Sequence, residues 1–211
     1  EQVACPVVLI DRLVQNGWCD AVGFDNYVGG RLAARYLLEG GHRHIGIVTG
    51  DVAESSALDR KRGFVDAIEQ TGERFDPALC VAGDYRFDSG YHAADRIIDG
   101  GATAVFCCND VMALGFRQRL AERGLQVTQD MQVIGYDNIL KRFGLGLHMT
   151  TVEQSVTDLA EACWRMLSVR IDAAIGRIGA KDGNDSDSVS AEDGGERPWL
   201  RHPRVQLLTP K

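Results

Sequence analysis

Polar and aromatic side chains recur at one kind of position, directly after the apolar runs that are predicted to be strands. They are Ser56 and Arg60 after residues 45–48, Tyr85 after 79–82, Asn109 after 104–108 and Asp137 after 131–136. The loops that leave the carboxyl ends of parallel strands converge with helix N-termini, and this is where open α/β sheets bind ligands. We therefore expect these side chains to face one site.

This combination of groups suits a small ligand that carries several hydroxyls. An arginine donates from a fixed fork, a carboxylate accepts from adjacent hydroxyls, and an aromatic ring packs on the apolar face of a sugar. Single residues have simpler interpretations: Asp84 and Asp110 could cap the helices that follow them, and Arg60 could be a solvated helix side chain. Tyr85 alone could be a surface aromatic. The common position at strand ends favours the ligand-binding interpretation.

The elements that must position these groups alternate along the chain. Short β-branched runs between helical patterns indicate βαβ units and a doubly wound parallel sheet. The predicted strands are 6–10, 21–24, 45–48, 79–82, 104–108 and 131–136, and the predicted helices are 29–39, 55–71, 88–99 and 110–123. Residues 151–175 are predicted to form one long helix, 176–197 a disordered acidic insertion, and 205–208 a closing strand.

Composition excludes several classes of protein. The formal net charge is −7, and no stripe of Lys and Arg is present, so this chain is not expected to bind nucleic acid by itself. No apolar run has the length of a membrane span, and the first residues lack the features of a secretion signal. The six cysteines are scattered and are interpreted as reduced thiols, which favours the cytoplasm.

Patterns of catalysis and metal binding are also missing. The sequence has no Gly-rich phosphate loop, no Gly-x-Ser-x-Gly elbow, and no metal-ligand spacing among its His and Cys residues. A hydrolase that used Asp84 or Cys108 would lack a visible activating base. We therefore expect a binding protein without a cofactor or metal, and not an enzyme.

Several stretches together resemble the effector-binding region of the lactose/galactose-repressor family of transcription regulators. The most specific are residues 103–110 (TAVFCCND) with 112–115 (MALG), and residues 133–138 (VIGYDN). Further matching stretches lie at 6–12, 25–33, 41–45, 60–64, 83–85, 89–91 and 150–154. Their order and spacing extend from Pro6 to Val205, interrupted by the acidic segment.

The resemblance implies a two-lobed, periplasmic-binding-protein-like α/β fold that closes on a ligand between doubly wound parallel sheets. In family terms, residues 1–42 are the remainder of the first lobe, 43–149 the second lobe, and 150–175 a helix that returns to the first lobe. Residues 176–197 are the insertion, and 198–211 the closing strand and tail.

The same resemblance implies a set of effector contacts. By motif, these are Arg60, Tyr85, Asn109 and Asp137, with Gln154 near the crossover between lobes. Asp11 and Ser56 are weaker additions. Effectors of the family are mostly sugars, sugar phosphates or nucleobases, and we expect a carbohydrate here.

Two departures from the family pattern modify these expectations. Family members begin with a helix-turn-helix DNA reader, a hinge helix and two further βα units, which do not occur in this sequence. The first lobe is therefore expected to be truncated, with exposed strand edges and an open apolar face. The family also often has a proline before the Thr-Thr-Val stretch, where this chain has His148-Met149.

The sequence favours the effector-binding domain of a sugar-responsive bacterial transcription regulator. We expect a cytoplasmic homodimer that reaches DNA only through a domain absent from this chain and does not contact membranes. The alternative is an extracytoplasmic sugar-binding protein of a transport system, which shares the fold.

Overall fold

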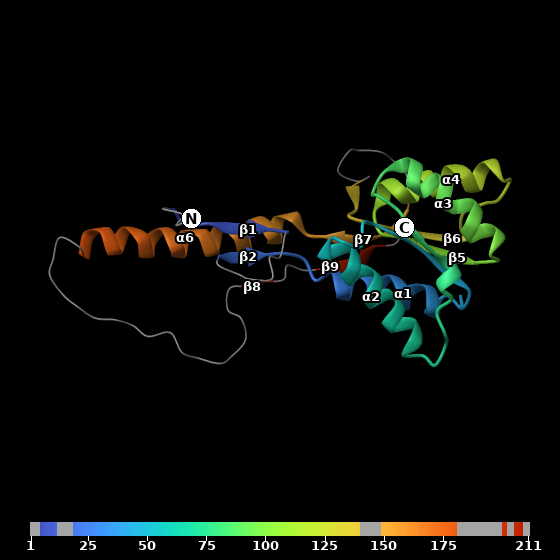
Figure 1. The fold of residues 1–211 in the computed structure, drawn as a ribbon, viewed down its shortest axis with the longest axis horizontal. Coiled ribbons are helices and arrows are strands. Elements are labelled where there is room, and N and C mark those ends of the chain that lie inside the picture. Colours follow the sequence, from blue (N-terminus) through green and yellow to red (C-terminus); the bar gives the residue numbers. More distant parts are fainter. Residues whose placement is uncertain (1–4, 12–18, 140–148, 181–199, 202–204, 209–211) are drawn as a thin grey trace. The chain divides into compact units, whose positions relative to one another are not determined.

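The computed structural model describes residues 5–11, 19–139, 149–180, 200–201 and 205–208. The chain divides into two compact units (Figure 1): unit 1 comprises Glu1–Phe24 and Ser155–Arg204, and unit 2 comprises Asp25–Gln154 and Val205–Lys211. The chain therefore passes between the units at residues 24–25, 154–155 and 204–205, which we call the three crossings.

Unit 2 is built on a six-stranded sheet of order β4-β3-β5-β6-β7-β9. Its strands are β3 (Ile45–Thr49), β4 (Cys80–Ala82), β5 (Ala104–Cys107), β6 (Gln132–Tyr136), β7 (Thr150–Gln154) and β9 (Val205–Leu208). All neighbours pair in parallel except β7 and β9, which pair antiparallel. The central strands β3 and β5 are buried throughout, as expected when helices cover both faces of a parallel sheet.

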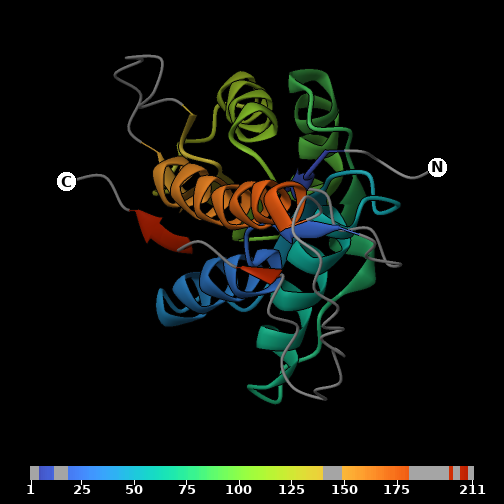
Figure 2. The ribbon, with the colours of Figure 1, turned by 90° about the vertical axis from the view of Figure 1, so that its left-hand side faces the viewer.

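Two helix pairs cover this sheet. The first pair is α1 (Asn26–Glu39) with α2 (Ser55–Glu69), and the second is α3 (Phe87–Asp99) with α4 (Asp110–Glu122); the 3-10 turn η1 (Pro77–Leu79) precedes β4. Figures 1 and 2 show the blue and teal pair on one side and the green pair on the other. This is the predicted α/β doubly wound architecture. The ends of α1, α2, α3 and α4 lie within three residues of the helix ends predicted from the sequence.

Glycines allow the helices of each pair to approach closely. A Cβ atom on Gly30 would overlap the backbone oxygen of Arg60, and one on Gly63 would overlap that of Tyr27. Gly90 and Gly115 have the same relation to the backbones of α4 and α3. The α1–α2 contact therefore brings the start of α1 against the first turns of α2, where Arg60 lies.

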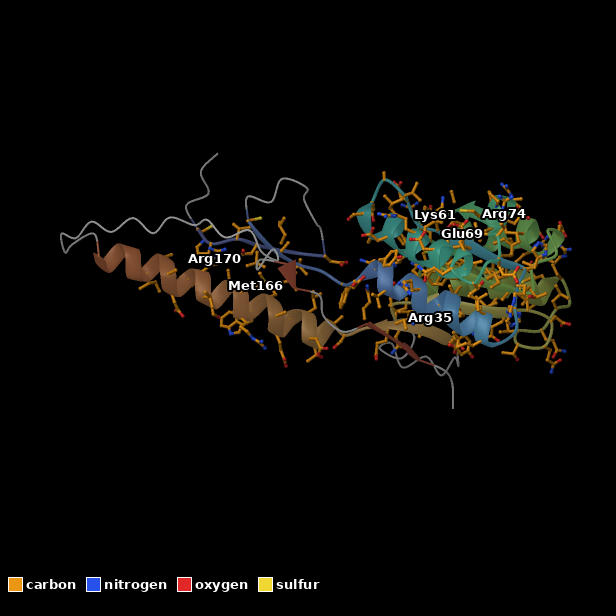
Figure 3. The ribbon with its side chains drawn as sticks, turned by 90° about the horizontal axis from the view of Figure 1, so that it is seen from below. Arg35, Lys61, Glu69, Arg74, Met166 and Arg170 are labelled. Atoms are coloured by element: carbon orange, nitrogen blue, oxygen red, sulfur yellow. The ribbon has the colours of Figure 1, made fainter. Side chains whose placement is uncertain are left out.

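Unit 1 contains a three-stranded parallel sheet of order β1-β2-β8, with β1 (Val8–Ile10), β2 (Asp20–Val22) and β8 (Leu200–Arg201). The long helix α6 (Val156–Ala180) belongs to the same unit. Arg170, labelled in Figure 3, binds the buried carboxylate of Asp20 through two nitrogens, one at 2.8 Å. On α6 the side chains of Trp164, Val169 and Ile175 are more than half exposed. Among the described helices, none is both long and apolar enough to cross a bilayer.

The predicted helix at 151–175 is wrong at both ends. Residues 150–154 form strand β7, because the β-branched Thr150, Thr151 and Val152 are buried between β6 and β9. The helix begins only at Val156, after Ser155, whose hydroxyl accepts from the amide of Asp158. It continues to Ala180, so residues 176–180, assigned to the acidic insertion, are helical; residues 181–197 lie outside the described residues.

The boundary between the compact units also differs from the one expected at residue 43. Unit 2 begins at Asp25, because α1 packs on α2 through the glycine contacts rather than with β1 and β2. Asp25 itself caps α1, since its carboxylate accepts from the amide of Val28 at 2.8 Å. The predicted start of this helix at Gly29 is therefore three residues late.

The close approach of α1 and α2 leads to a stability prediction. Gly30→Ala should lower the free energy of unfolding by about 1–3 kcal/mol, because the added methyl group must push two backbones apart. Denaturant unfolding measures this loss. The matched control is Gly176→Ala on α6, where nothing lies within 4 Å of the added atom and alanine is the better helix former. Equal losses in both variants would contradict the packing argument.

Candidate functional site

The candidate site lies at the carboxyl edge of the unit 2 sheet. The strands β3, β5 and β6 end there at Thr49, Cys107 and Tyr136, and the parallel register brings these ends side by side. The helices α2 and α4 start from the same edge, so their first turns direct backbone N–H groups toward it. Five of the side chains selected from the sequence belong to this edge: Ser56, Arg60, Tyr85, Asn109 and Asp137.

Arg60 is the buried centre of the site, with a side chain only 6% exposed. Its Nε donates to Asn26 Oδ1 at 2.8 Å, and its Nη1 donates to the backbone oxygen of Cys108. Its Nη2 lies 3.8 Å from Asp137 Oδ1. The solvated interpretation of Arg60 is therefore wrong: each guanidinium nitrogen faces an oxygen atom of unit 2.

An aromatic ring completes the surroundings of this cation. The guanidinium carbon lies 3.8 Å from the centroid of the Tyr136 ring, within the range of a cation–π contact. Burial by itself would lower the pKa of Arg60, but Tyr136 and Asp137 outweigh burial and leave that pKa raised. Arg60 therefore remains charged. Burial also raises the pKa of the neighbouring Tyr136 hydroxyl.

Asp137 is the more accessible member of the pair, with a side chain 30% exposed. Its backbone has φ +96°, and the next residue, Asn138, has φ +54°. A non-glycine residue in this region costs about 1–3 kcal/mol and needs support from its surroundings. The support includes a hydrogen bond from the Asp137 amide to Val152 O at 2.8 Å and one from Asn138 Nδ2 to Glu153 at 2.9 Å.

Asn109 connects α4 with the loop that carries Tyr85. Its Oδ1 accepts from the amide of Met112, which makes it the N-cap of α4, and its Nδ2 donates to Tyr85 O at 2.8 Å. Tyr85 has φ +66°, and its ring packs over Gly50, where a Cβ atom would overlap it. Asn109 thus holds the backbone of a strained residue whose ring forms part of the site.

The hydroxyl of Tyr85 is buried without a hydrogen-bond partner among the described residues. Burial raises the pKa of Tyr85, and the charge of Arg60 and a nearby Ser56 hydroxyl oppose this rise. A buried hydroxyl that lacks a partner costs free energy.

Asp110 is not the helix cap considered from the sequence, because Asn109 occupies that position. Its fully buried carboxylate instead accepts from Thr151 Oγ1 at 2.7 Å and from the amide of Ile139 at 2.8 Å. Burial raises the pKa of Asp110 to about 6. Gly135 makes room for this carboxylate, since a Cβ atom there would overlap it. Asp110 therefore ties the segment after Asp137 to β7.

Asn26 and Tyr136, which were not predicted from the sequence, both contact Arg60. Asn26 Oδ1 accepts from Arg60, and it also lies 3.4 Å from the Tyr136 hydroxyl. Gln154, which was selected, donates from Nε2 to Asn26 Oδ1 at 3.3 Å. The signal for Asn26 was an Asp-Asn pair at a helix start, and the signal for Tyr136 was only its place in a strand.

Two other polar residues considered from the sequence are Asp84 and Asp11. Asp84 is exposed and turns back on its own loop, where its carboxylate accepts from the amide of Arg86 at 3.0 Å. Hydrogen bonds from Ser89 and Arg86 lower the pKa of Asp84. Asp11 belongs to unit 1, with φ +57° and an amide that donates to Val22 O at 2.8 Å.

The arrangement offers hydrogen bonding and charge rather than an activated nucleophile. Burial raises the pKa of the Cys108 thiol to about 12, so it is a thiol and not a thiolate near neutral pH. Among the residues that the structure describes, His, Cys, Asp and Glu side chains form no group of three or more that could hold a metal ion.

Comparisons with known proteins show which family the chain resembles. Residues 34–180 match the family model described as periplasmic binding protein-like domain. The HTH-type transcriptional repressor PurR of Pasteurella multocida is 36% identical over 168 residues, which cover 79% of this chain and 50% of that protein. The PurR of Salmonella arizonae is 37% identical over 169 residues. The chain thus spans about half the length of the curated relatives it matches.

Solved structures show the same likeness. A complex of the transcriptional regulator CelR with cellobiose has a TM-score of 0.76 at 25% identity, over 96% of this chain and 57% of that one. A LacI family transcriptional regulator from Enterococcus faecium with bound ribose also has a TM-score of 0.76 at 25% identity, over 97% and 69% of the chains.

The burial of Asp110 predicts a pH dependence of stability. Because its pKa of about 6 lies above the unfolded value of about 3.9, the folded state binds the proton more tightly than the unfolded state. The contribution of Asp110 to stability therefore increases as the pH falls through about 6 toward about 4, by at most about 1.4 kcal/mol for each unit of pH.

Asp110→Asn removes the titrating group with little change of shape. Denaturant unfolding at pH 7.5, 6.5 and 5.5 measures the unfolding free energy of both proteins. As the pH falls, the wild type should gain stability relative to the variant. Other groups cancel in this comparison. Parallel pH profiles for the two proteins would show that Asp110 does not titrate in this range.

Proposed function

The chain belongs to the periplasmic binding protein-like domain family, in the form found in lactose/galactose-repressor-type regulators, and on that premise we propose that it binds a small polar effector at the unit 2 site. The effector would contact Arg60, Asp137, Asn109, Tyr85 and Ser56, with Gln154 behind them. Asp11 remains a proposed contact from unit 1. The function is binding and not catalysis.

The observation that supports this proposal most is the pair formed by Arg60 and Asp137. Their nearest charged atoms are 3.8 Å apart, longer than a hydrogen bond, and Asp137 is five times more exposed than Arg60 by side-chain fraction, 30% against 6%. The left-handed backbone of Asp137 places its carboxylate beside the buried guanidinium of Arg60. Such strain in a residue supported from several sides is typical of ligand-binding positions.

A carbohydrate fits this set of groups. Asp137 can accept from two adjacent hydroxyls. The Tyr85 ring adds an apolar surface against which a sugar face can pack. The complexes of CelR with cellobiose and of the Enterococcus faecium regulator with ribose support the same class of ligand.

The proposed biological role is effector sensing by a transcription regulator. The similar curated proteins are named as repressors, which favours this role over the transport alternative. In the proposal the protein acts in the cytoplasm as a homodimer. Because the chain spans about half the length of those relatives, contact with DNA is assigned to a part of the protein outside this chain.

A thermal-shift screen tests the ligand class. The panel contains cellobiose, ribose, other mono- and disaccharides, sugar phosphates and purine bases. A ligand that binds only the folded state stabilises it by about 2.7 kcal/mol at a hundredfold excess over its Kd. Stabilisation by a sugar supports the proposal. Stabilisation by a purine base alone, or by no compound while the protein melts cooperatively, would contradict the carbohydrate assignment.

Substitution of Asp137 tests the site. Asp137→Ala should weaken binding of the sugar found in the screen by about 1.5–3 kcal/mol, because a charged hydrogen-bond acceptor is lost; isothermal titration calorimetry measures this. The matched control is Asp84→Ala, which removes a more exposed carboxylate from the same sheet edge and should leave the affinity within about twofold. Similar affinities for both variants would remove Asp137 from the site.

A further inference from the structure

We propose that Asn26 is a positioning residue that joins Arg60 to the crossings of the chain between units 1 and 2, through one hydrogen-bond cluster with Gln154 and Tyr136. The inference deepens the proposed function, since it concerns how occupancy of the Arg60 site is communicated. The hydrogen bonds themselves do not depend on which ligand binds.

A single oxygen lies at the centre of the cluster. Asn26 Oδ1 is 2.8 Å from Arg60 Nε, 3.3 Å from Gln154 Nε2 and 3.4 Å from the Tyr136 hydroxyl. These four residues are each less than 9% exposed. Since all three neighbours can donate, the acceptor oxygen of the Asn26 amide has to face them. Buried donors of this kind are costly to leave without an acceptor.

The cluster lies where the chain leaves unit 2. Asn26 is the second residue after the first crossing, at 24–25, and Gln154 is the last residue before the second crossing, at 154–155. Gln154 is also the register partner of Val205, the first residue after the third crossing. One side-chain bond, from Gln154 to Asn26, therefore links the three points at which the chain passes between the units.

Arg60 shares the same acceptor, so its position depends on that of Asn26. The packing leaves little room for either residue to adjust independently. Gly29 lies against the Tyr136 hydroxyl and Gly30 against the backbone of Arg60, each so closely that a Cβ atom would overlap its neighbour. A displacement of the guanidinium would move the Asn26 side chain or break its bond.

The consequence is a direct route from ligand contact to the connections between units. A ligand that draws Arg60 toward Asp137 changes its bond to Asn26, and Asn26 shares its oxygen with Gln154. A ligand changes an equilibrium between two arrangements only through different contacts in each. This cluster supplies such a difference at the crossings themselves.

Hydrogen exchange of the ligand-free protein tests the inference. Backbone exchange measured by mass spectrometry reports local opening, and the relevant segments are residues 25–29, 150–154 and 205–208. Strand β5, in the middle of the sheet, serves as the internal reference for global stability. Because no ligand is present, the outcome is separate from that of the thermal-shift screen.

Three variants probe the cluster. Gln154→Met keeps the length of the side chain but cannot donate, and Arg60→Lys keeps the charge but loses the Nε donor. Both should increase exchange by about tenfold in residues 25–29, and Gln154→Met should do so in 150–154 and 205–208 as well. Asn26→Asp retains an acceptor oxygen and should leave exchange in these segments within about twofold of the wild type.

Tyr27→Phe is the matched control. It removes a 3.0 Å hydrogen bond from α1 to Asp66 on α2, one residue away from Asn26 but outside the cluster. It should not change exchange in residues 150–154 or 205–208. If Arg60→Lys increases exchange in β5 as much as in the other segments, the variant has lost global stability. The test of the proposal then depends on Gln154→Met.

The proposal is overturned if Gln154→Met leaves residues 25–29 at the wild-type rate, because the crossings would then not be linked through Asn26. It is equally overturned if a folded Arg60→Lys variant leaves those residues unchanged. Increased exchange in residues 25–29 for both folded variants, with Tyr27→Phe unchanged in residues 150–154 and 205–208, supports it.

Discussion

The buried guanidinium of Arg60 has lost its hydration, and polar groups of the protein must replace the water. The carboxyl edge of the unit 2 sheet supplies these groups. An isolated buried charge would cost several kcal/mol. The amide oxygen of Asn26, the backbone oxygen of Cys108, the carboxylate of Asp137 and the ring of Tyr136 reduce that cost. They come from α1, from β6 and from the residues that directly follow β5 and β6, so one cation connects segments that are distant in sequence.

The packing of α1 on α2 follows from the same requirement. Asn26 can reach Arg60 only if the two helices approach closely, and glycines at positions 30 and 63 permit that approach. The helix pair thereby belongs to unit 2, although α1 directly follows a strand of unit 1. The start of α1 consequently has two tasks, because it leads the chain into unit 2 and also supplies a hydrogen-bond acceptor to the site.

Adjacent residues at the start of α4 serve the site in different ways. Asn109 caps the helix and holds the backbone of Tyr85, whereas Asp110 turns inward and anchors Thr151 and the amide of Ile139. Asn109 thereby positions the backbone of Tyr85, and Asp110 positions the amide of Ile139, two residues after Asp137, whose backbone is left-handed. Hydrogen bonds from the start of α4 thus reach Tyr85 and the segment that follows Asp137.

The sequence by itself determined the α/β class, the alternation of the unit 2 elements and the shared edge of Arg60, Tyr85, Asn109 and Asp137, because these depend on local periodicity and on a general property of parallel sheets. It misassigned Thr150–Gln154, which looked helical but became a strand once β6 and β9 could bury it. Only the tertiary structure decided that Arg60 is buried, that Asn26 joins it to Gln154 and that Asp110 is an internal anchor. Those roles arise from contacts between residues up to 128 positions apart, which no local pattern encodes.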